Sequence, residues 1–122
     1  MLLSRSTIGL SLLAAGLALA GAACGSASPS APTVNADVTI SMVGDRGNQS
    51  FAPNPTTMRV GQTVAWKNND TIVHNATQDA SRFATGNVNA GATSAPIAMG
   101  TAGTFAYHCT IHPGMVGTLV VQ

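Results

Sequence analysis

Charge is scarce in this chain. Only 7% of its 122 residues are Asp, Glu, Lys or Arg, and glutamate is absent. Five basic residues stand against four acidic ones, and no basic run occurs that could collect phosphate groups. We therefore expect no nucleic acid partner. Removal of residues 1–23 as an export signal would remove Arg5 and leave a net charge of about zero.

Helical periodicity is missing as well. No long segment repeats apolar residues every three or four positions, so few or no helices are expected. Apolar and polar residues alternate instead, as in 37–42, where Val38, Ile40 and Met42 share one face. Similar short patterns follow at residues 56–60, 63–68, 71–78, 104–109 and 116–121. The stretch 79–95 is rich in Gly, Asn, Ser and Thr, which is typical of a loop.

Several short strands at turn-like spacing predict an all-β fold. The folded part is expected to span residues 36–122 as a single Greek-key antiparallel β-sandwich. A core of this size is small but sufficient. We expect one such domain and a monomeric protein.

The first 23 residues have the layout of an export signal. A lone Arg5 precedes an apolar run from Ile8 to Ala20, and small residues follow. The run is too short and too rich in Ala and Gly for a comfortable membrane span. We therefore expect an exported protein that acts outside the cytoplasm.

Cys24 follows this segment and resembles the acylated cysteine of a bacterial lipobox, although Gly21 stands where Leu is usual. A lipid on the sulfur would remove a spare thiol from an oxidising compartment. We expect Cys24 to anchor the chain at the outer face of the cytoplasmic membrane, with the Ser-, Ala- and Pro-rich residues 24–35 as a flexible tether. Plain cleavage after residues 18–20, which would give a periplasmic or secreted protein, stays open.

Reactive side chains are few but crowded. The chain has three histidines and two cysteines, yet YHCTIHPGM (107–115) holds two of the histidines, a cysteine and a methionine. Strand alternation would point Cys109 into the sandwich and His108 away from it. Cys109, His112 and Met115 follow at intervals of three through a turn that contains Pro and Gly. One short loop can therefore aim all three side chains at one point.

Thiolate, imidazole and thioether are donors that suit copper. One more imidazole would complete the His₂Cys set with a weak axial Met that marks an electron-transfer copper site, and His74 can supply it. Structural zinc rarely uses a thioether. A binuclear copper centre would need a second cysteine in the loop, and the C-x-x-C-H motif for haem is absent. An inward Cys109 would also be poorly placed as a nucleophile.

Each donor alone has an ordinary explanation. Cys109 could be a small buried hydrophobe, Met115 could be core packing, and His112 could be a surface loop residue. A disulfide between Cys24 and Cys109 is a further alternative. Three donors of matching softness within seven residues favour the copper site over these readings.

The segments MRVGQTVAWKNNDTIVHN (58–75) and GTFAYHCTIHPGMVGTLVV (103–121) resemble those of a cupredoxin, a plastocyanin-like small blue copper protein. The two residues between His112 and Met115 match the short amicyanin-type loop, although Ile111 replaces a proline and Gly114 a bulky apolar residue. The resemblance implies the following roles around one type 1 copper: ligands His74, Cys109 and His112, weak axial ligand Met115, and Asn75 tying the two ligand loops together.

A mononuclear type 1 (blue) copper protein follows as the predicted function. It would cycle between Cu(II) and Cu(I) and shuttle single electrons between redox protein partners, with His112 as the electron portal, and it would not be an enzyme. The alternative is a copper-binding carrier or buffer without a redox partner. Carriers often have clustered Met or His, whereas Met42, Met58 and Met99 are scattered.

Overall fold

The computed structural model describes Gly25 and residues 35–122. The predicted export signal (1–23), the predicted acylation site Cys24 and nearly all of the predicted tether lie outside the described residues. Within the part that is described, no helix has the length and apolar character needed to cross a bilayer.

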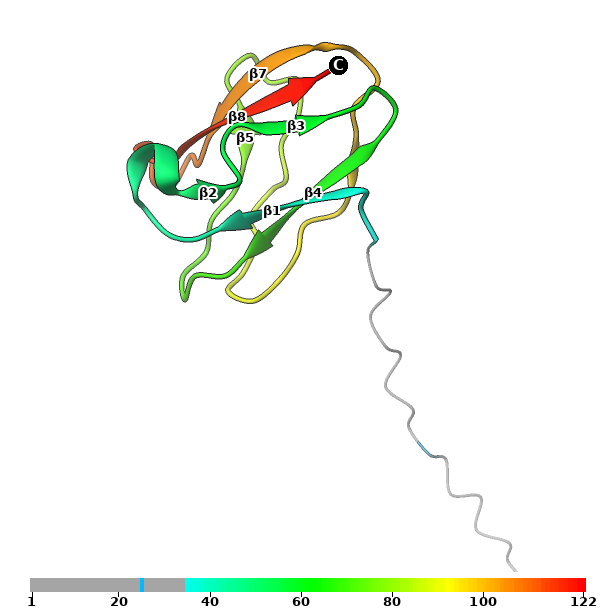
Figure 1. Ribbon diagram of the computed structural model, residues 1–122. Coiled ribbons are helices and arrows are strands. Elements are labelled where there is room, and N and C mark those ends of the chain that lie inside the picture. The colour runs from blue at the N-terminus through cyan, green and yellow to red at the C-terminus, as the bar shows by residue number, and fades with distance from the viewer. Residues whose placement is uncertain (1–24, 26–34) are drawn as a thin grey trace, which may run out of the picture. The chain divides into compact units, whose positions relative to one another are not determined.

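Residues 38–121 form two four-stranded sheets that pack face to face (Figure 1). One sheet has the strand order β2-β1-β4-β6, and the other has the order β3-β8-β7-β5. A single 3₁₀ turn, η1 (Gly47–Gln49), is the one helical element among the described residues. The strands are β1 (Val38–Met42), β2 (Phe51–Ala52), β3 (Thr56–Met58), β4 (Thr63–Asn68), β5 (Thr77–Gln78), β6 (Ile97–Ala98), β7 (Gly103–His108) and β8 (Val116–Val121). The predicted all-β sandwich is confirmed.

The strand pairing is mixed, which differs from the antiparallel pairing that we predicted. β1 pairs with β4 in parallel over five residues, and β3 pairs with β8 in parallel over three. The cause is that the chain leaves the first sheet after β2, forms β3 in the second, and returns as β4 running beside β1. The remaining pairs are antiparallel.

Alternation along the strands sorts the side chains as predicted. Ile40 and Met42 are fully buried, whereas Thr39 is exposed and Ser41 is partly exposed. Val60 is an exception to the expected pattern, because β3 ends at Met58 and the chain turns at Gly61, whose φ is +89°. The buried apolar cluster comprises Ile40, Met42, Phe51, Met58, Val64, Trp66, Ala76, Phe83, Val88, Met99, Phe105, Tyr107, Cys109, Met115, Leu119 and Val121.

Aromatic rings occupy the middle of this cluster. The Tyr107 ring lies 4.8 Å from that of Phe51 and 5.6 Å from that of Trp66, both in edge-to-face orientation. Burial raises the pKa of the Tyr107 hydroxyl to about 12, so the group is neutral at physiological pH. Because Tyr107 belongs to β7, this packing fixes the strand that leads into residues 109–115.

Candidate metal centre

The loop from Cys109 to Met115, called here the ligand loop, joins β7 to β8. Its ends are closed by the pairing of His108 with Val116. The backbone N–H of Cys109 donates to the Met115 carbonyl (3.0 Å), and that of Met115 donates to the His112 carbonyl (2.9 Å). The loop therefore folds back on itself, which brings its two sulfur-bearing residues together in the buried cluster.

His74 reaches the same end of the sandwich from the segment after β4. We predicted an extended conformation for 71–78, but only Thr77–Gln78 forms a strand. His74 instead makes an isolated antiparallel bridge with Val88, through N–H···O bonds of 3.2 and 2.7 Å. The bridge holds the His74 backbone while the side chain is fully buried.

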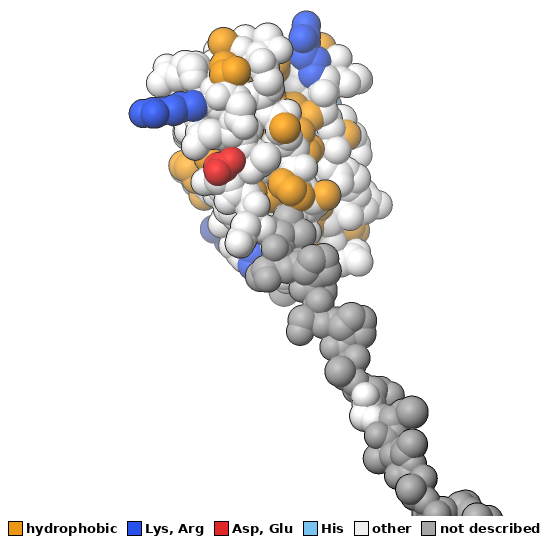
Figure 2. Space-filling model, turned by 90° about the vertical axis from the view of Figure 1, so that its right-hand side faces the viewer, with side chains coloured by type: hydrophobic (Ala, Val, Ile, Leu, Met, Phe, Trp, Pro, Cys, Tyr) orange, Lys and Arg blue, Asp and Glu red, His pale blue; other side chains and the backbone are white. Residues whose placement is uncertain are grey.

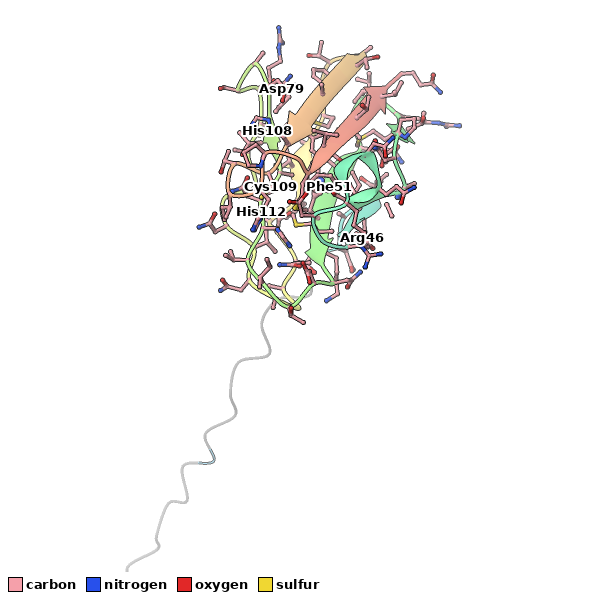
Figure 3. All side chains as sticks on the ribbon, turned by 90° about the vertical axis from the view of Figure 1, so that its left-hand side faces the viewer. Arg46, Phe51, Asp79, His108, Cys109 and His112 are labelled. Carbon is pink, nitrogen blue, oxygen red and sulfur yellow. The ribbon has the colours of Figure 1, made fainter. Side chains whose placement is uncertain are left out.

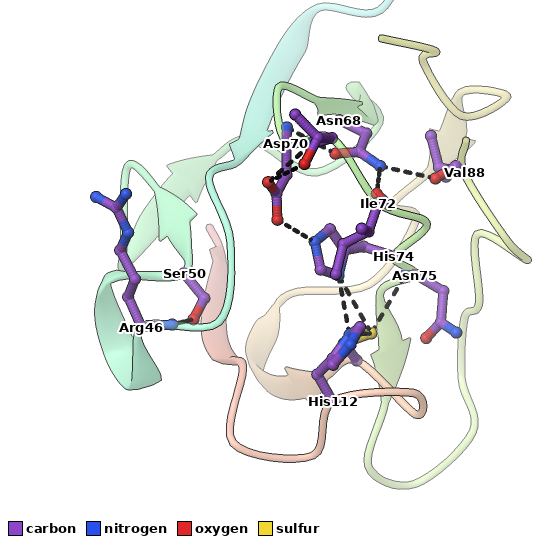
Figure 4. Close-up of polar contacts among 11 residues, drawn as sticks. Arg46, Ser50, Asn68, Asp70, Ile72, His74, Asn75, Val88 and His112 are labelled. Carbon is purple, nitrogen blue, oxygen red and sulfur yellow. Dashed lines mark hydrogen bonds and ion pairs between the residues drawn. The ribbon is translucent and has the colours of Figure 1, made fainter. Parts of the chain in front are cut away.

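Three of the four predicted ligands converge on one point (Figure 4). The Nδ1 atoms of His74 and His112 are 3.1 Å apart. The Cys109 Sγ lies 4.0 Å from Nδ1 of His74 and 3.9 Å from Nδ1 of His112. Two bonds of about 2 Å to a shared metal span at most about 4 Å, so the triangle has the size that a metal ion needs.

The donor atoms at this point are of different chemical types, and most of them are shielded from water. His74, Cys109 and Met115 are fully buried, whereas His112 is partly exposed. Two imidazoles and a thiol, with the Met115 thioether on the same ligand loop, match the soft ligand set of an electron-transfer copper site. The residues present therefore fit a type 1 copper.

Asn75 joins the segment that carries His74 to the ligand loop. Its side-chain amide donates to the Thr110 hydroxyl (2.8 Å), and its side-chain carbonyl accepts the Thr110 backbone N–H (3.0 Å). Its own backbone N–H donates to Cys109 Sγ at 3.4 Å. The sulfur thus has a hydrogen-bond donor from the neighbouring loop, and the two loops are held at a fixed separation.

Asp70 is a site residue that sequence reasoning missed. Its Oδ2 lies 2.8 Å from Nε2 of His74, on the side of the ring away from the other donors (Figure 4). The His74 ring, and after it the backbone N–H of Thr71, hold the pKa of the Asp70 carboxyl below its ordinary value. The available signal was a carboxylate four residues before a candidate ligand, because metal-binding histidines often donate their second N–H to a carboxylate.

His108 takes no part in this cluster. Its Nδ1 lies 2.8 Å from the exposed Asp79 carboxylate, and Figure 3 shows this pair apart from Cys109 and His112. The outward orientation predicted for His108 and the inward one predicted for Cys109 are both confirmed.

A two-sheet sandwich with two imidazoles, a thiol and a thioether at one end defines a cupredoxin. The family model for copper binding proteins of the plastocyanin/azurin type matches residues 38–122, and the chain belongs to this family. Plastocyanin from Scenedesmus fuscus is 35% identical over 98 residues, covering 70% of this chain and all of the relative.

Solved structures agree with this assignment. A purple cupredoxin from Nitrosopumilus maritimus has a TM-score of 0.64 and 26% identity, covering 70% of this chain and 100% of the other. A mutant of amicyanin in its reduced Cu(I) form has a TM-score of 0.61 and 23% identity, covering 70% and 81% of the two chains. The amicyanin match supports the fold alone.

Proposed function

We propose that this protein is a type 1 copper electron carrier that passes single electrons between redox partner proteins outside the cytoplasm. His74, Cys109 and His112 would bind the copper, and Met115 would be the weak axial ligand. The observation that carries the proposal is the triangle of two Nδ1 atoms and one Sγ with edges of 3.1 to 4.0 Å. Copper held there would supply a one-electron couple between Cu(II) and Cu(I).

The chain's own contribution is a fixed set of donors. The hydrogen bonds of Asn75, the bridge at His74 and the folded-back ligand loop hold the donors in place before any metal is bound. Cu(II) and Cu(I) favour different geometries, so a rigid site between the two moves little when an electron arrives. The buried aromatic cluster keeps water away from the sulfur.

His112 is the ligand best placed to pass electrons. It is the only partly exposed member of the three-donor triangle, and it lies between exposed Ile111 and exposed Pro113 on the ligand loop. A small apolar surface around a metal ligand allows a partner to approach closely without removing charged groups from water.

The burial of the sulfur donors argues against a copper carrier. A carrier needs a metal that exchanges, and Cys109 and Met115 are fully buried. Met42, Met58 and Met99, which could have formed a relay for Cu(I), are instead buried in the core between the sheets. The arrangement favours a resident copper.

Localisation rests on the sequence of the first 24 residues. We infer a removed export signal (1–23), a lipid anchor at Cys24 with a tether to residue 35, and the copper domain from 36 to 122. Mass spectrometry of the mature chain from membranes tests this. An acylated N-terminal cysteine is expected, whereas a soluble chain that begins near residue 21 would contradict the anchor.

The copper centre is tested by titrating the purified protein with Cu(II) and recording visible and EPR spectra. An intense blue thiolate-to-copper band with narrow copper hyperfine splitting is expected, and Cys109→Ser should abolish it. Cys24→Ser is the matched control and should keep the full band. A protein that binds Zn²⁺ or Cu(I) but never becomes blue would contradict electron transfer and favour the carrier.

A further inference from the structure

The two ring nitrogens of His74 have different partners. Nδ1 faces the other two donors, and Nε2 lies 2.8 Å from Oδ2 of Asp70. An ionised carboxylate can only accept a hydrogen bond, so Nε2 must carry the proton. A neutral ring protonated at Nε2 leaves the lone pair of Nδ1 directed at the metal position. The Asp70 contact thus selects the tautomer of His74 that can bind a metal.

The Asp70 carboxylate is itself held in place. Its Oδ1 accepts the Thr71 backbone N–H at 2.7 Å, and the Asp70 backbone N–H donates to Oδ1 of Asn68 at 2.9 Å. Asn68 is fully buried, and its amide donates to the carbonyls of Ile72 (2.7 Å) and Val88 (2.9 Å). A network rooted in β4 therefore fixes the carboxylate relative to the ring.

The chain also passes close to the carboxylate on another side. A Cβ placed on Gly44 would lie 3.2 Å from Oδ2 of Asp70, and Gly44 has a φ of +111°, which favours glycine. The Asp70 side chain is 25% exposed. A negative charge partly shielded from water acts more strongly on a nearby cation than an exposed one does.

We propose that Asp70 is a positioning residue that acts on the metal through His74, and that it favours Cu(II) over Cu(I). A charged acceptor on Nε2–H makes Nδ1 a stronger donor, and the carboxylate charge stabilises the more highly charged metal. Asp70 thereby lowers the reduction potential of the centre. This inference rests on the proposed function, because it assigns a role to a residue beside that copper site.

The test is the reduction potential of the copper-loaded protein with Asp70→Asn and with Asp70→Ala. Asparagine keeps an acceptor for Nε2–H but removes the charge, so the blue band should persist while the potential rises. We expect the ratio of Cu(II) to Cu(I) affinity to fall at least tenfold, which corresponds to about 59 mV. Alanine removes the acceptor too, so a larger rise and altered copper hyperfine splitting are expected. An unchanged potential in Asp70→Asn would overturn the inference.

Asp45→Asn is the matched control. Oδ1 of Asp45 lies 3.3 Å from the position of a Cβ on Gly114, so this carboxylate is adjacent to the ligand loop and has the same charge. It makes no hydrogen bond to His74 or His112. We expect the reduction potential to rise distinctly less in Asp45→Asn than in Asp70→Asn. Equal rises would show a general charge effect and overturn a specific role for Asp70.

Imidazole ¹⁵N NMR of the metal-free protein gives a readout without copper. His74 should be protonated at Nε2 in the wild type and should populate both tautomers in Asp70→Ala. A wild-type His74 protonated at Nδ1 would overturn the inference. If His74 shows the expected tautomers but no blue centre forms, the proposed function fails, whereas the contact between Asp70 and His74 is supported. If the centre is blue and the potentials do not move, only this inference fails.

Discussion

Asn75 shows how much one side chain can hold at this site. Its carbonyl oxygen also accepts the Thr77 hydroxyl (3.2 Å), and its amide also donates to Oδ1 of Asn87 (3.3 Å). Together with the two bonds to Thr110, these contacts link three segments that are distant in sequence. Asn75 is 4% exposed, so water cannot readily replace lost partners.

Asn75→Ala should therefore lower the free energy of unfolding of the metal-free protein by about 1–3 kcal/mol, because the part-buried hydrogen bonds with Thr110 are lost. Copper should also dissociate faster, since the ligand loop is no longer tied. Denaturant unfolding and stopped-flow transfer of copper to a chelator measure the two effects. Asn75→Asp keeps both acceptor contacts but turns a buried carboxylate toward Oδ1 of Asn87, so it should lose at least as much stability as Asn75→Ala. Equal stability of Asn75→Ala and wild type would contradict the role.

Single residues differ in how well sequence alone reveals them. Cys109, His112 and Met115 could be predicted as a set, because donor softness and a spacing of three are visible in the chain. Asp70 was missed, since its one signal, a position four residues before a candidate ligand, does not show that the carboxylate meets the ring. Its role depends on the fold of residues 69–74, which brings a carboxylate against a ring four positions later.

At the scale of elements, β7 and β8 form the antiparallel pair that carries the ligand loop. Tyr107 pairs with Gly117 in this ladder, and the Tyr107 ring covers the glycine so closely that no side chain fits there. A glycine within a strand often marks such a close approach. The pairing places the ring in the core beside Phe51 and Trp66 and sets the register of the loop ends.

Gly117→Ala should destabilise the protein by about 1–3 kcal/mol, because the new methyl group would collide with the ring of Tyr107. Gly100→Ala is the matched control. A Cβ at Gly100 would meet no atom within 4 Å, so little change is expected. Thermal unfolding of both metal-free variants provides the comparison. A Gly117→Ala protein as stable as the control would show that the ring moves aside at no cost.

Strand faces could be predicted from sequence, but strand partners could not. Alternation placed Phe105, Tyr107 and Cys109 on the inner face, because burial follows the pleat. The parallel pairing of β1 with β4 leaves no trace in that pattern. It depends on which sheet each strand joins, and that is decided by long-range packing across the sandwich.

For the whole molecule, charge is sparse and balanced. Residues 35–122 contain four basic and four acidic side chains, which gives a formal charge of zero with neutral histidines. On the face shown in Figure 2, the charged side chains are few and do not gather into a patch. Long-range attraction of a charged partner is therefore weak.

The rate of electron transfer should depend little on salt. With small redox reagents of either charge sign, we expect the second-order rate constant to change less than about twofold between roughly 0.05 and 0.5 M ionic strength. Stopped-flow absorbance at the maximum of the blue band would follow the reaction. Arg59→Glu, which changes the net charge by two at an exposed position, should introduce a clear salt dependence. A steep salt dependence in the wild type would contradict the expectation.

The division of the donors between two parts of the chain also links copper to folding. Cys109, His112 and Met115 lie within seven residues, whereas His74 is 35 positions from Cys109. An unfolded chain keeps the three donors of the ligand loop close together, so it retains affinity for copper. Any binding to the unfolded state reduces the stabilisation that copper gives to the folded one. Metal capture can therefore precede folding, and the fold then completes the centre by adding one imidazole.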